Sequence, residues 1–290
     1  TSLRILNRTK PDVLFVKGGF VGVPVGIAAR LKGIPIITHD SDTVGGLANK
    51  IVGRWAVVHA TGMPAKNYGY RQSSVKYVGI PLDPRVKPVK SSDQQEAKSS
   101  LHIPEEGFVL LVAGGGQGSQ TINEKILAIA PRLLESNLAL HIIHITGSQN
   151  LDGVKRDYAS SLPKLFKNRV HILGFTGDFY KYVTASDLII SRAGATSIAE
   201  YALAGKACII IPSPFLASGH QLKNAEMLRA EDAAIIIDDN APPEELLEVV
   251  EELAANEVRR KQLAGLLHKL AKPNAAHELA KIITETAKNN

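Results

Sequence analysis

Short apolar runs alternate with amphipathic stretches from the first residues of the chain. Runs with the length of strands cover residues 13–16, 35–38 and 55–59, and helical patterns lie between them at 24–31 and 47–52. A further strand pattern at 74–78 leads into Gly79-Ile80-Pro81. Strands that alternate with helices indicate a parallel sheet with helices on both faces.

The alternation restarts after a junction near residue 84, where two prolines and a polar stretch at 90–100 interrupt it. Strands are expected at 108–113, 140–145, 170–173, 188–191, 207–211 and 233–237, and helices at 121–134, 151–160, 179–185, 197–204 and 220–230, with three more beginning near Pro243, Val258 and Ala275. We therefore predict an α/β protein with a first domain over 1–84, a second doubly wound domain over 85–270, and a last helix over 271–290 that can pack back on the first domain.

The composition excludes several classes of protein. Of the 290 residues 44% are apolar and 21% charged, as in soluble globular proteins, which argues against a disordered chain. The single cysteine, Cys208, cannot form an internal disulfide, so we expect the reducing cytosol. The longest apolar runs are far shorter than the roughly 18 to 20 residues that a membrane-spanning helix needs.

Positive charge is concentrated in the first domain. Residues 1–84 hold eleven Lys and Arg against four Asp, a net charge of +7, whereas the remaining residues carry a net charge of −1. Such an excess attracts anionic surfaces such as phosphorylated lipid, membrane headgroups or nucleic acid. We expect no nucleic acid, because the segment has no aromatic stacking series and no nucleic-acid motif. A solvated face without a partner is the alternative.

A glycine-rich turn, Gly114-Gly-Gly-Gln-Gly-Ser119, connects a predicted strand to a predicted helix. Glycines let backbone N–H groups approach a phosphate closely, and the helix N-terminus adds a positive dipole. The third glycine of the dinucleotide fingerprint is absent, as is the lysine motif of nucleoside-triphosphate loops. The turn is therefore either an anion cradle or a purely structural tight turn.

Three further polar segments follow predicted strands. In Ser191-Arg-Ala-Gly-Ala-Thr-Ser-Ile-Ala-Glu200, Glu200 either accepts hydrogen bonds from ribose hydroxyls or forms a helix capping box with Ser197. The helix start at 220–224 carries amide and basic side chains that suit a sugar or merely cap the helix. Phe175-Thr176 can stack on and bond a flat base, unless Phe175 belongs to the core.

The first domain contains two candidate segments. Gly18-Gly19 follows a strand and Lys17, as a phosphate-facing turn would. His39-Asp40-Ser41-Asp42 is expected just after the strand at 35–38, where His39 is otherwise a polar strand-end residue. The Asp-x-Asp spacing can hold a divalent cation, but no further ligand is near in sequence. Hydrolase-triad and zinc motifs are absent from the sequence.

Taken together and in this order, the motifs resemble the MurG family, the N-acetylglucosaminyltransferases that convert lipid I to lipid II in peptidoglycan synthesis. The resemblance covers essentially the whole chain. It is carried by Gly18-Gly-Phe20, Gly33-Ile-Pro-Ile-Ile-Thr-His39, Gly46-Leu-Ala-Asn-Lys50, Val78-Gly79-x-Pro81, Gly114 to Gly118 with Asn123, Ser191 to Glu200, and His220-Gln-x-Lys-Asn224.

The resemblance implies a GT-B fold, in which two Rossmann-like domains face a cleft and the second domain holds UDP-N-acetylglucosamine. It implies donor contacts from the diphosphate loop (Gly115, Gly116, Gln117, Gly118, Asn123), from the base and ribose side (Phe175, Thr176, Glu200), and from the phosphate and sugar side (Arg192, Ala195, Thr196, Gln221, Asn224). On the acceptor side it implies Gly18, Gly19, His39, Asp40 and Asp42, facing a polyprenyl-pyrophosphate lipid. The enzyme would be peripheral on the inner leaflet of the cytoplasmic membrane, with no metal or other cofactor.

The sequence departs from the family at several positions. The family's His-Glu-Gln-Asn is His39-Asp40-Ser41-Asp42 here, and the usual serine of the diphosphate loop is Gly116. The arginine of the family's Gly-Asn-Pro-Val-Arg is Asp83, unless Arg85 substitutes. Because the sequence starts with Thr1 and reads at once as an ongoing α/β pattern, we expect the opening strands, the first glycine loop and the histidine base of the family to precede it.

The mechanism implied by the resemblance is an inverting transfer of N-acetylglucosamine to the 4-hydroxyl of the muramyl sugar. Three alternatives stay open at this point. A diacylglycerol glycosyltransferase has related motifs and a neutral lipid acceptor. A UDP-N-acetylglucosamine 2-epimerase shares the fold and needs no lipid. The third is a UDP-sugar-binding fragment without turnover.

Overall fold

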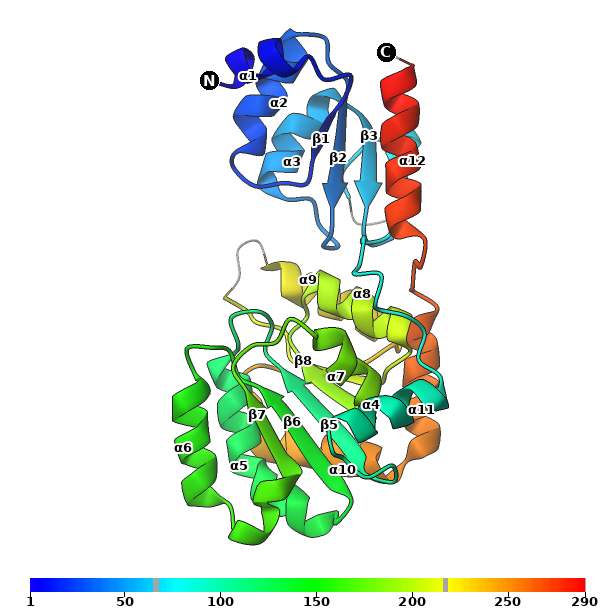
Figure 1. Cartoon of the computed structure of the whole chain (residues 1–290). Coiled ribbons are helices and arrows are strands. Elements are labelled where there is room, and N and C mark those ends of the chain that lie inside the picture. Colours follow the sequence, from blue (N-terminus) through cyan, green and yellow to red (C-terminus); the bar gives the residue numbers. More distant parts are fainter. Residues whose placement is uncertain (65–67, 216–218, 290) are drawn as a thin grey trace. The chain divides into compact units, whose positions relative to one another are not determined.

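The computed structural model describes residues 1–64, 68–215 and 219–289. The chain forms two compact units (Figure 1). Unit 1 comprises Thr1–Asp83 and Lys272–Asn290, and unit 2 comprises Pro84–Ala271. Among the described helices, none has the length and apolar character needed to span a bilayer.

Unit 1 is a parallel four-stranded sheet in the order β1-β2-β3-β4. Its strands are β1 (Leu14–Val16), β2 (Ile36–Asp40), β3 (Ala56–Thr61) and β4 (Val75–Tyr77), and its α-helices are α1 (Ser2–Thr9), α2 (Gly22–Leu31), α3 (Leu47–Val52) and α12 (Ala275–Lys288). Successive side chains of a strand point to opposite faces. Accordingly, Ile36 packs with α1, α2 and α3 on one face, and Ile37 packs with α12 on the other. Figure 1 shows α2 and α12 on opposite sides of this sheet.

Unit 2 is a parallel six-stranded sheet in the order β10-β9-β8-β5-β6-β7. Its strands are β5 (Phe108–Ala113), β6 (Leu140–Ile145), β7 (Val170–Leu173), β8 (Leu188–Ser191), β9 (Cys208–Ile210) and β10 (Ile235–Ile236). Its α-helices are α4 (Ser91–Ser100), α5 (Gln120–Ser136), α6 (Leu151–Ser161), α7 (Phe179–Ala185), α8 (Ala195–Ala204), α9 (His220–Ala230), α10 (Pro243–Ala255) and α11 (Glu257–His268). If β5 is counted as the first strand, the order is 6-5-4-1-2-3, which is the strand order of dinucleotide-binding Rossmann domains. The direction in which successive strands are added reverses between the first and fourth strands, here β5 and β8.

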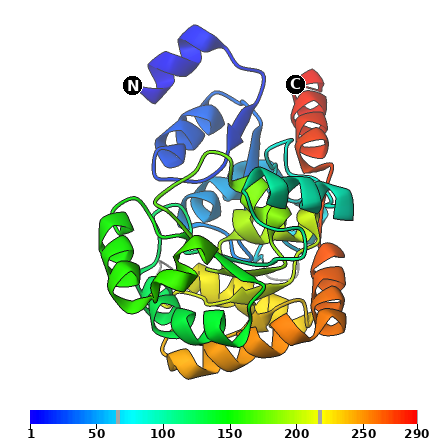
Figure 2. The same cartoon turned by 60° about the horizontal axis from the view of Figure 1, so that its bottom comes forward.

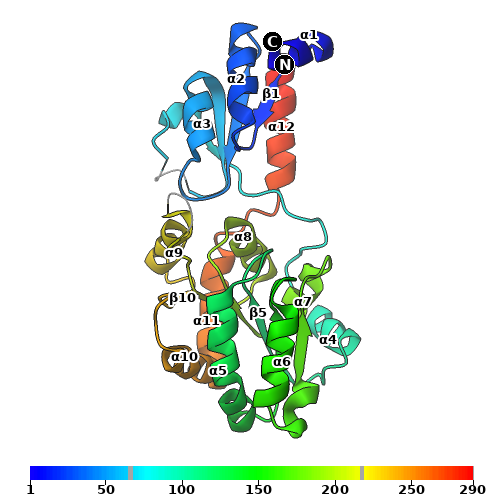
Figure 3. The ribbon, with the colours of Figure 1, turned by 90° about the vertical axis from the view of Figure 1, so that its left-hand side faces the viewer.

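The core of unit 2 explains why its strands read as unbroken apolar runs. The central strands are buried on both faces, so neither face needs polar side chains. Alternate residues such as Leu110 and Ile142 pack against α5, α6 and α10. Helices α5 and α10 lie side by side on this face (Figure 2), and α4 and α7 lie on the opposite one (Figure 3). The predicted α/β class with two Rossmann-like sheets is confirmed.

The structure corrects the prediction at three places. Residues 2–9 form helix α1, which the pattern analysis did not predict. The polar stretch interpreted as part of the junction forms helix α4. Strand β2 continues two residues further than expected, so that His39 and Asp40 belong to the strand.

Candidate functional site

The topology of unit 2 marks one place for a ligand. In open parallel sheets, ligands bind at the carboxyl ends of the strands, where the strand order reverses. Here that point lies between β5 and β8, whose last residues, Ala113 and Ser191, are register partners. The glycine turn after β5 and the segment Arg192–Gly194 after β8 therefore start side by side.

The turn after β5 presents open backbone. Gly115, Gly116 and Gln117 are exposed. A Cβ added to Gly115 or Gly116 would have no neighbouring atom within 4 Å, so a ligand can come close to this backbone. The Gly118 N–H donates to the Gly115 carbonyl at 3.0 Å and closes the turn. Ser119 then caps α5 by accepting from the Ile122 N–H. This arrangement suits a phosphate held by N–H groups.

Asn123 follows this turn, near the start of α5. Its side chain is 3% exposed, and its Nδ2 donates to the Thr146 carbonyl at 3.0 Å. Its Oδ1 lies 3.0 Å from Nε2 of buried His144, whose Nδ1 lies 3.0 Å from the Tyr158 hydroxyl. Since Oδ1 accepts, Nε2 carries the proton and Nδ1 accepts from Tyr158. Burial lowers the pKa of His144 to about 3 and keeps the ring neutral. Asn123 thus fastens α5 to the end of β6, with its amide group bonded to protein.

Helix α8 brings a second set of amide groups to the same edge of the sheet. It begins at Ala195 with Gly194 as N-cap, and Thr196 in its first turn is exposed. The capping-box interpretation of Glu200 is wrong, because Ser197 lies inside the helix instead of at its N-cap. Glu200 is half-buried in the second turn. The helix N-terminus and one carboxylate thus follow β8 directly.

Arg192 ties three strand ends together. Its Nη1 donates to the Ile211 carbonyl at 3.0 Å and pairs with the Asp239 carboxylate. Both side chains are largely buried, so the pair is well shielded from solvent. Sequence reasoning did not single out Asp239. The acidic pair Asp238-Asp239 after the last strand was the available signal.

Gln221 and Asn224 on α9 hold neighbouring loops. The Gln221 Oε1 accepts from the Ser213 N–H after β9, and the buried Asn224 Nδ2 donates to the Ala193 carbonyl after β8, both at 2.9 Å. The structure therefore brings both predicted sugar-side residues to the carboxyl edge. There they fix the backbone of the loops next to α8.

Phe175 and Thr176 follow β7 at the same edge, two strands away from β5. The alternative that Phe175 belongs to the core is wrong, because its side chain is 66% exposed. The Thr176 Oγ1 accepts from the Asp178 N–H at 3.1 Å. An exposed ring beside a fixed turn is suited to stacking on a flat base.

In unit 1, the turn after β1 is open and His39 is not. A Cβ on Gly18 or Gly19 would meet no atom within 4 Å, and α2 begins three residues later at Gly22. His39 is fully buried, and its Nε2 donates to the Gly79 carbonyl at 2.9 Å. Burial is the main reason why its pKa is lowered. The turn can face a ligand, whereas the His39 ring fastens the end of β2 to Gly79.

The carboxylate of Asp40 is occupied by protein donors. It accepts from the Gly46 N–H and Asn49 Nδ2, each at 2.9 Å, and from the Tyr70 hydroxyl at 2.8 Å. Asp40 therefore anchors the start of α3. Asp42 is half-buried, and its carbonyl accepts from the Tyr68 hydroxyl. Within the described ranges, no group of three or more His, Cys, Asp or Glu side chains is arranged to hold a metal.

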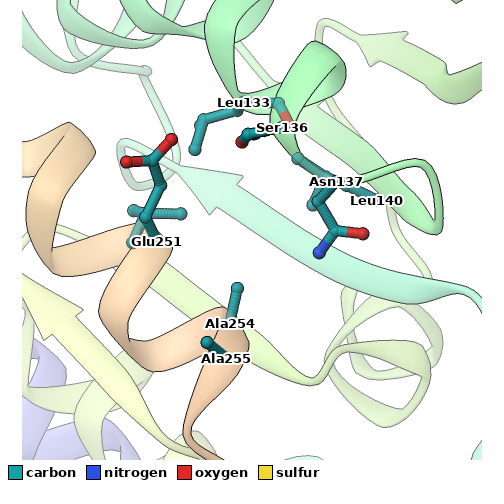
Figure 4. Close-up of a pocket in the computed structure, with 8 residues that line it drawn as sticks. Leu133, Ser136, Asn137, Leu140, Glu251, Ala254 and Ala255 are labelled. Carbon is teal, nitrogen blue, oxygen red and sulfur yellow. Dashed lines mark hydrogen bonds between the residues drawn. The ribbon is translucent and has the colours of Figure 1, made fainter.

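A cavity of about 360 Å³ lies elsewhere in unit 2, between α5 and α10. Figure 4 shows Ser136 and Asn137 on one side of it and Glu251 and Ala254 on the other. Leu140 in its wall is the first residue of β6. The cavity therefore lies at the amino end of that strand, away from the edge that carries the glycine turn.

Comparison with known proteins gives a consistent assignment. The model of the glycosyltransferase family 28 C-terminal domain matches residues 109–279, and that of the N-terminal domain matches residues 1–60. The chain is 31% identical over 286 residues to a UDP-N-acetylglucosamine--N-acetylmuramyl-(pentapeptide) pyrophosphoryl-undecaprenol N-acetylglucosamine transferase of Caldicellulosiruptor saccharolyticus, covering 98% of this chain and 75% of that protein. A transferase of the same name from Halothermothrix orenii is also 31% identical, with 99% and 78% covered.

Solved structures agree. The crystal structure of Acinetobacter baumannii MurG superposes with a TM-score of 0.77 at 28% identity, covering 98% of this chain and 76% of that one. The S. aureus MnaA–UDP co-structure, at 15% identity and a TM-score of 0.71 over 96% of this chain and 77% of that one, shares the fold. The chain therefore belongs to glycosyltransferase family 28 and, within it, to the MurG family of N-acetylglucosamine transferases.

Proposed function

We propose that the chain transfers N-acetylglucosamine from UDP-N-acetylglucosamine to the 4-hydroxyl of the muramyl sugar of lipid I, giving lipid II with inversion at the anomeric carbon. One observation carries the proposal: the open Gly115–Gly116 backbone lies at the reversal point of a Rossmann sheet, beside the N-terminus of α8. Relatives that match nearly the whole chain are named for this donor and acceptor.

The donor lies along the carboxyl edge of unit 2 in this proposal. The diphosphate lies against Gly115–Gly118 and the first turn of α8, with Ala195 and Thr196. The uracil stacks on Phe175 beside Thr176, and Glu200 accepts from the ribose hydroxyls. The sugar extends toward α9, where Gln221 and Asn224 shape the loops. Support comes from the exposure of Phe175 and of the glycine turn.

The chemistry is a single displacement. A base takes the proton of the 4-hydroxyl, the oxygen forms a bond to the anomeric carbon, and the bond from that carbon to the diphosphate breaks with release of UDP. Negative charge then grows on the diphosphate. Backbone N–H groups of the turn after β5 and of the α8 N-terminus stabilise it, as fixed dipoles do in other active sites. No metal ion takes part in this scheme.

In this proposal, unit 1 binds the lipid acceptor and the membrane surface. Pro24, Ile27 and Leu31 are exposed and share one face of α2 through their three- and four-residue spacing, and exposed Phe20 precedes the helix. An exposed apolar stripe of this kind is typical of an interaction site. Basic side chains on or next to α1, α2 and α3 are exposed as well: Arg4, Arg8, Lys10, Lys17, Arg30, Lys32, Lys50 and Arg54. These features support binding to an anionic membrane surface at the cytoplasmic face.

Incubation of the protein with UDP-N-acetylglucosamine and lipid I in vesicles tests the proposal. We expect UDP and lipid II in equal amounts, with the same rate in the presence of a chelator. A strict requirement for Mg²⁺ would contradict the metal-free scheme.

The same assay separates the alternatives. Formation of N-acetylmannosamine products from the donor alone identifies a 2-epimerase. Transfer to diacylglycerol instead of lipid I identifies a diacylglycerol glycosyltransferase. Binding of UDP-N-acetylglucosamine without product in any of these reactions identifies a donor-binding chain without turnover.

A further inference from the structure

Arg85 contacts the turn that follows β7 and the start of α7. Its Nη1 donates to the Asp178 carboxylate at 3.0 Å, and its Nη2 donates to the Gly177 carbonyl at 3.4 Å. Its guanidinium carbon lies 4.5 Å from the centre of the Tyr180 ring. Arg85 is the second residue of unit 2, so it fastens the chain that arrives from unit 1 to the segment Gly177–Tyr180.

The position of Asp178 extends these contacts to Thr176. Asp178 is the N-cap residue of α7, and its side chain makes no cap hydrogen bond to that helix. Its carboxylate is paired with Arg85. The backbone N–H of Asp178 donates to the Thr176 Oγ1 at 3.1 Å. A continuous path of contacts thus runs from Arg85 through Asp178 to Thr176, next to the exposed ring of Phe175.

The Arg85–Asp178 pair is too exposed to matter much for folding. The two side chains are 48% and 64% exposed, and ion pairs with this exposure contribute little to stability. The planar guanidinium instead fixes the orientation of the turn, because it contacts a carboxylate, a carbonyl and an aromatic ring at the same time. A group that orients a turn without stabilising the fold is expected to act on what the turn binds.

We infer that Arg85 is a positioning residue for the donor's base: it holds the turn 175–178 in the conformation in which Phe175 and Thr176 meet the uracil. This inference rests on the proposed function. It predicts that loss of Arg85 lowers the affinity for ligands that contain uridine, and that Asp178 transmits this effect. The rate of the chemical step, once the donor is bound, should not change.

The test compares the full chain with Arg85→Ala, Asp178→Ala and the double variant by calorimetric titration with UDP. We expect each single variant to raise the dissociation constant about threefold to tenfold, the range for a lost orienting contact, with unchanged thermal unfolding. The double variant should be no weaker than either single one, because both changes break the same path. Arg85→Lys, which keeps the charge and loses the fork, should fall between Arg85→Ala and wild type.

Arg259→Ala is the matched control, because Arg259 also pairs with an exposed aspartate of unit 2, Asp232, away from the candidate site. It should bind UDP like the wild type. In turnover, Arg85→Ala should raise KM for the donor and leave kcat unchanged.

Two results would overturn the inference: UDP binding by Arg85→Ala equal to that of Arg259→Ala, or losses that add in the double variant. The second result would mean that Arg85 does not act through Asp178. If Arg85→Ala unfolds, Asp178→Asn alone tests the same path. Failure of the wild type to bind UDP would instead contradict the proposed function, so the two failures are distinguishable.

Discussion

Gly118 and Gly147 meet at the carboxyl ends of β5 and β6 with no space for a side chain on either. A Cβ on Gly118 would lie 2.0 Å from the Thr146 carbonyl oxygen, and one on Gly147 would lie 2.2 Å from the Gln117 carbonyl oxygen. The φ angles of the two glycines are +80° and +89°. The turn after β5 is thus held by direct backbone contact with the next strand, while its Gly115–Gly116 tip stays open.

Gly118→Ala should therefore destabilise the protein. The new methyl group overlaps backbone that cannot move without shifting β6, and the left-handed conformation adds strain, so we expect a loss of about 3 kcal/mol in the free energy of unfolding. Urea unfolding monitored by circular dichroism measures this loss. Gly153→Ala in α6 is the control, since its Cβ would meet no atom within 4 Å, and it should cost nothing. Equal stability of the two variants would contradict the packing argument.

Gly116→Ala should instead leave stability unchanged and weaken ligand binding. Gly116 does not have a positive φ, and its Cβ would be in open space, so the thermal midpoint should not change. A methyl group there stands between the backbone and a bound diphosphate, and we expect UDP affinity to fall by about tenfold. Gly116→Ser should bind better than Gly116→Ala, because its hydroxyl can donate to a phosphate oxygen. Unchanged UDP binding by Gly116→Ala would show that the diphosphate lies elsewhere.

Glu200→Ala should weaken the binding of UDP through the ribose alone. Loss of a charged acceptor should cost about tenfold in UDP affinity. Titration with 2′-deoxy-UDP checks the cause. The deoxy ligand should bind more weakly than UDP to the wild type and as well as UDP to the variant. If the variant still discriminates between the two ligands, Glu200 does not bind the 2′-hydroxyl.

The pattern of the sequence was sufficient for the elements that are governed by local periodicity. The strands of unit 2 read as unbroken apolar runs, and the strand at 188–191 has the predicted bounds in the structure. Helix α4 was missed because its residues are almost all polar. It is held by Gln94 and Lys98, which reach Asp187 more than 85 residues later in the chain. No local pattern contains such a pairing.

The same limit applies to the candidate site. Residue type and position drew attention to Asn123 and Asn224, but could not show that their amide groups bond the Thr146 and Ala193 carbonyls. The extension of β2 has a similar cause. His39 and Asp40 can be buried in a strand because Gly79, Asn49 and Tyr70 supply their partners. In the sequence alone, a polar side chain whose protein partner is distant along the chain cannot be distinguished from one that binds a ligand.

The buried His144 should make stability depend on pH. Its pKa is about 3 in the folded protein because of burial and about 6.5 in the unfolded chain. The unfolded state therefore binds a proton that the folded state does not between these values, and stability is lost as the pH falls below about 6.5. This group alone should cost about 2 kcal/mol between pH 7 and pH 5.

Urea unfolding at the two pH values, for the wild type and His144→Gln, isolates this contribution. The variant should be less stable at pH 7, because Asn123 and Tyr158 lose their partner, but its stability should change less with pH. Other buried histidines, such as His141 with a pKa lowered to about 4 by burial, retain their own share. Identical pH dependence in both proteins would mean that His144 takes up a proton in the folded state.

Binding of unit 1 to membranes should depend on the exposed apolar side chains of α2 and on Phe20, which precedes this helix. Phe20 and Leu31 are 87% and 73% exposed, and burying such side chains in the headgroup region contributes about 1.5 kcal/mol or more each. Phe20→Ser with Leu31→Ser should therefore weaken binding to anionic vesicles by about tenfold or more in a sedimentation assay and leave UDP binding intact. Leu138→Ser with Leu165→Ser in unit 2, at 80% and 79% exposure, is the matched control and should bind like the wild type. If both pairs of substitutions have equal effects, exposure in general and not the α2 face drives binding. If neither has an effect but high salt releases the protein, the basic side chains alone hold it to the surface.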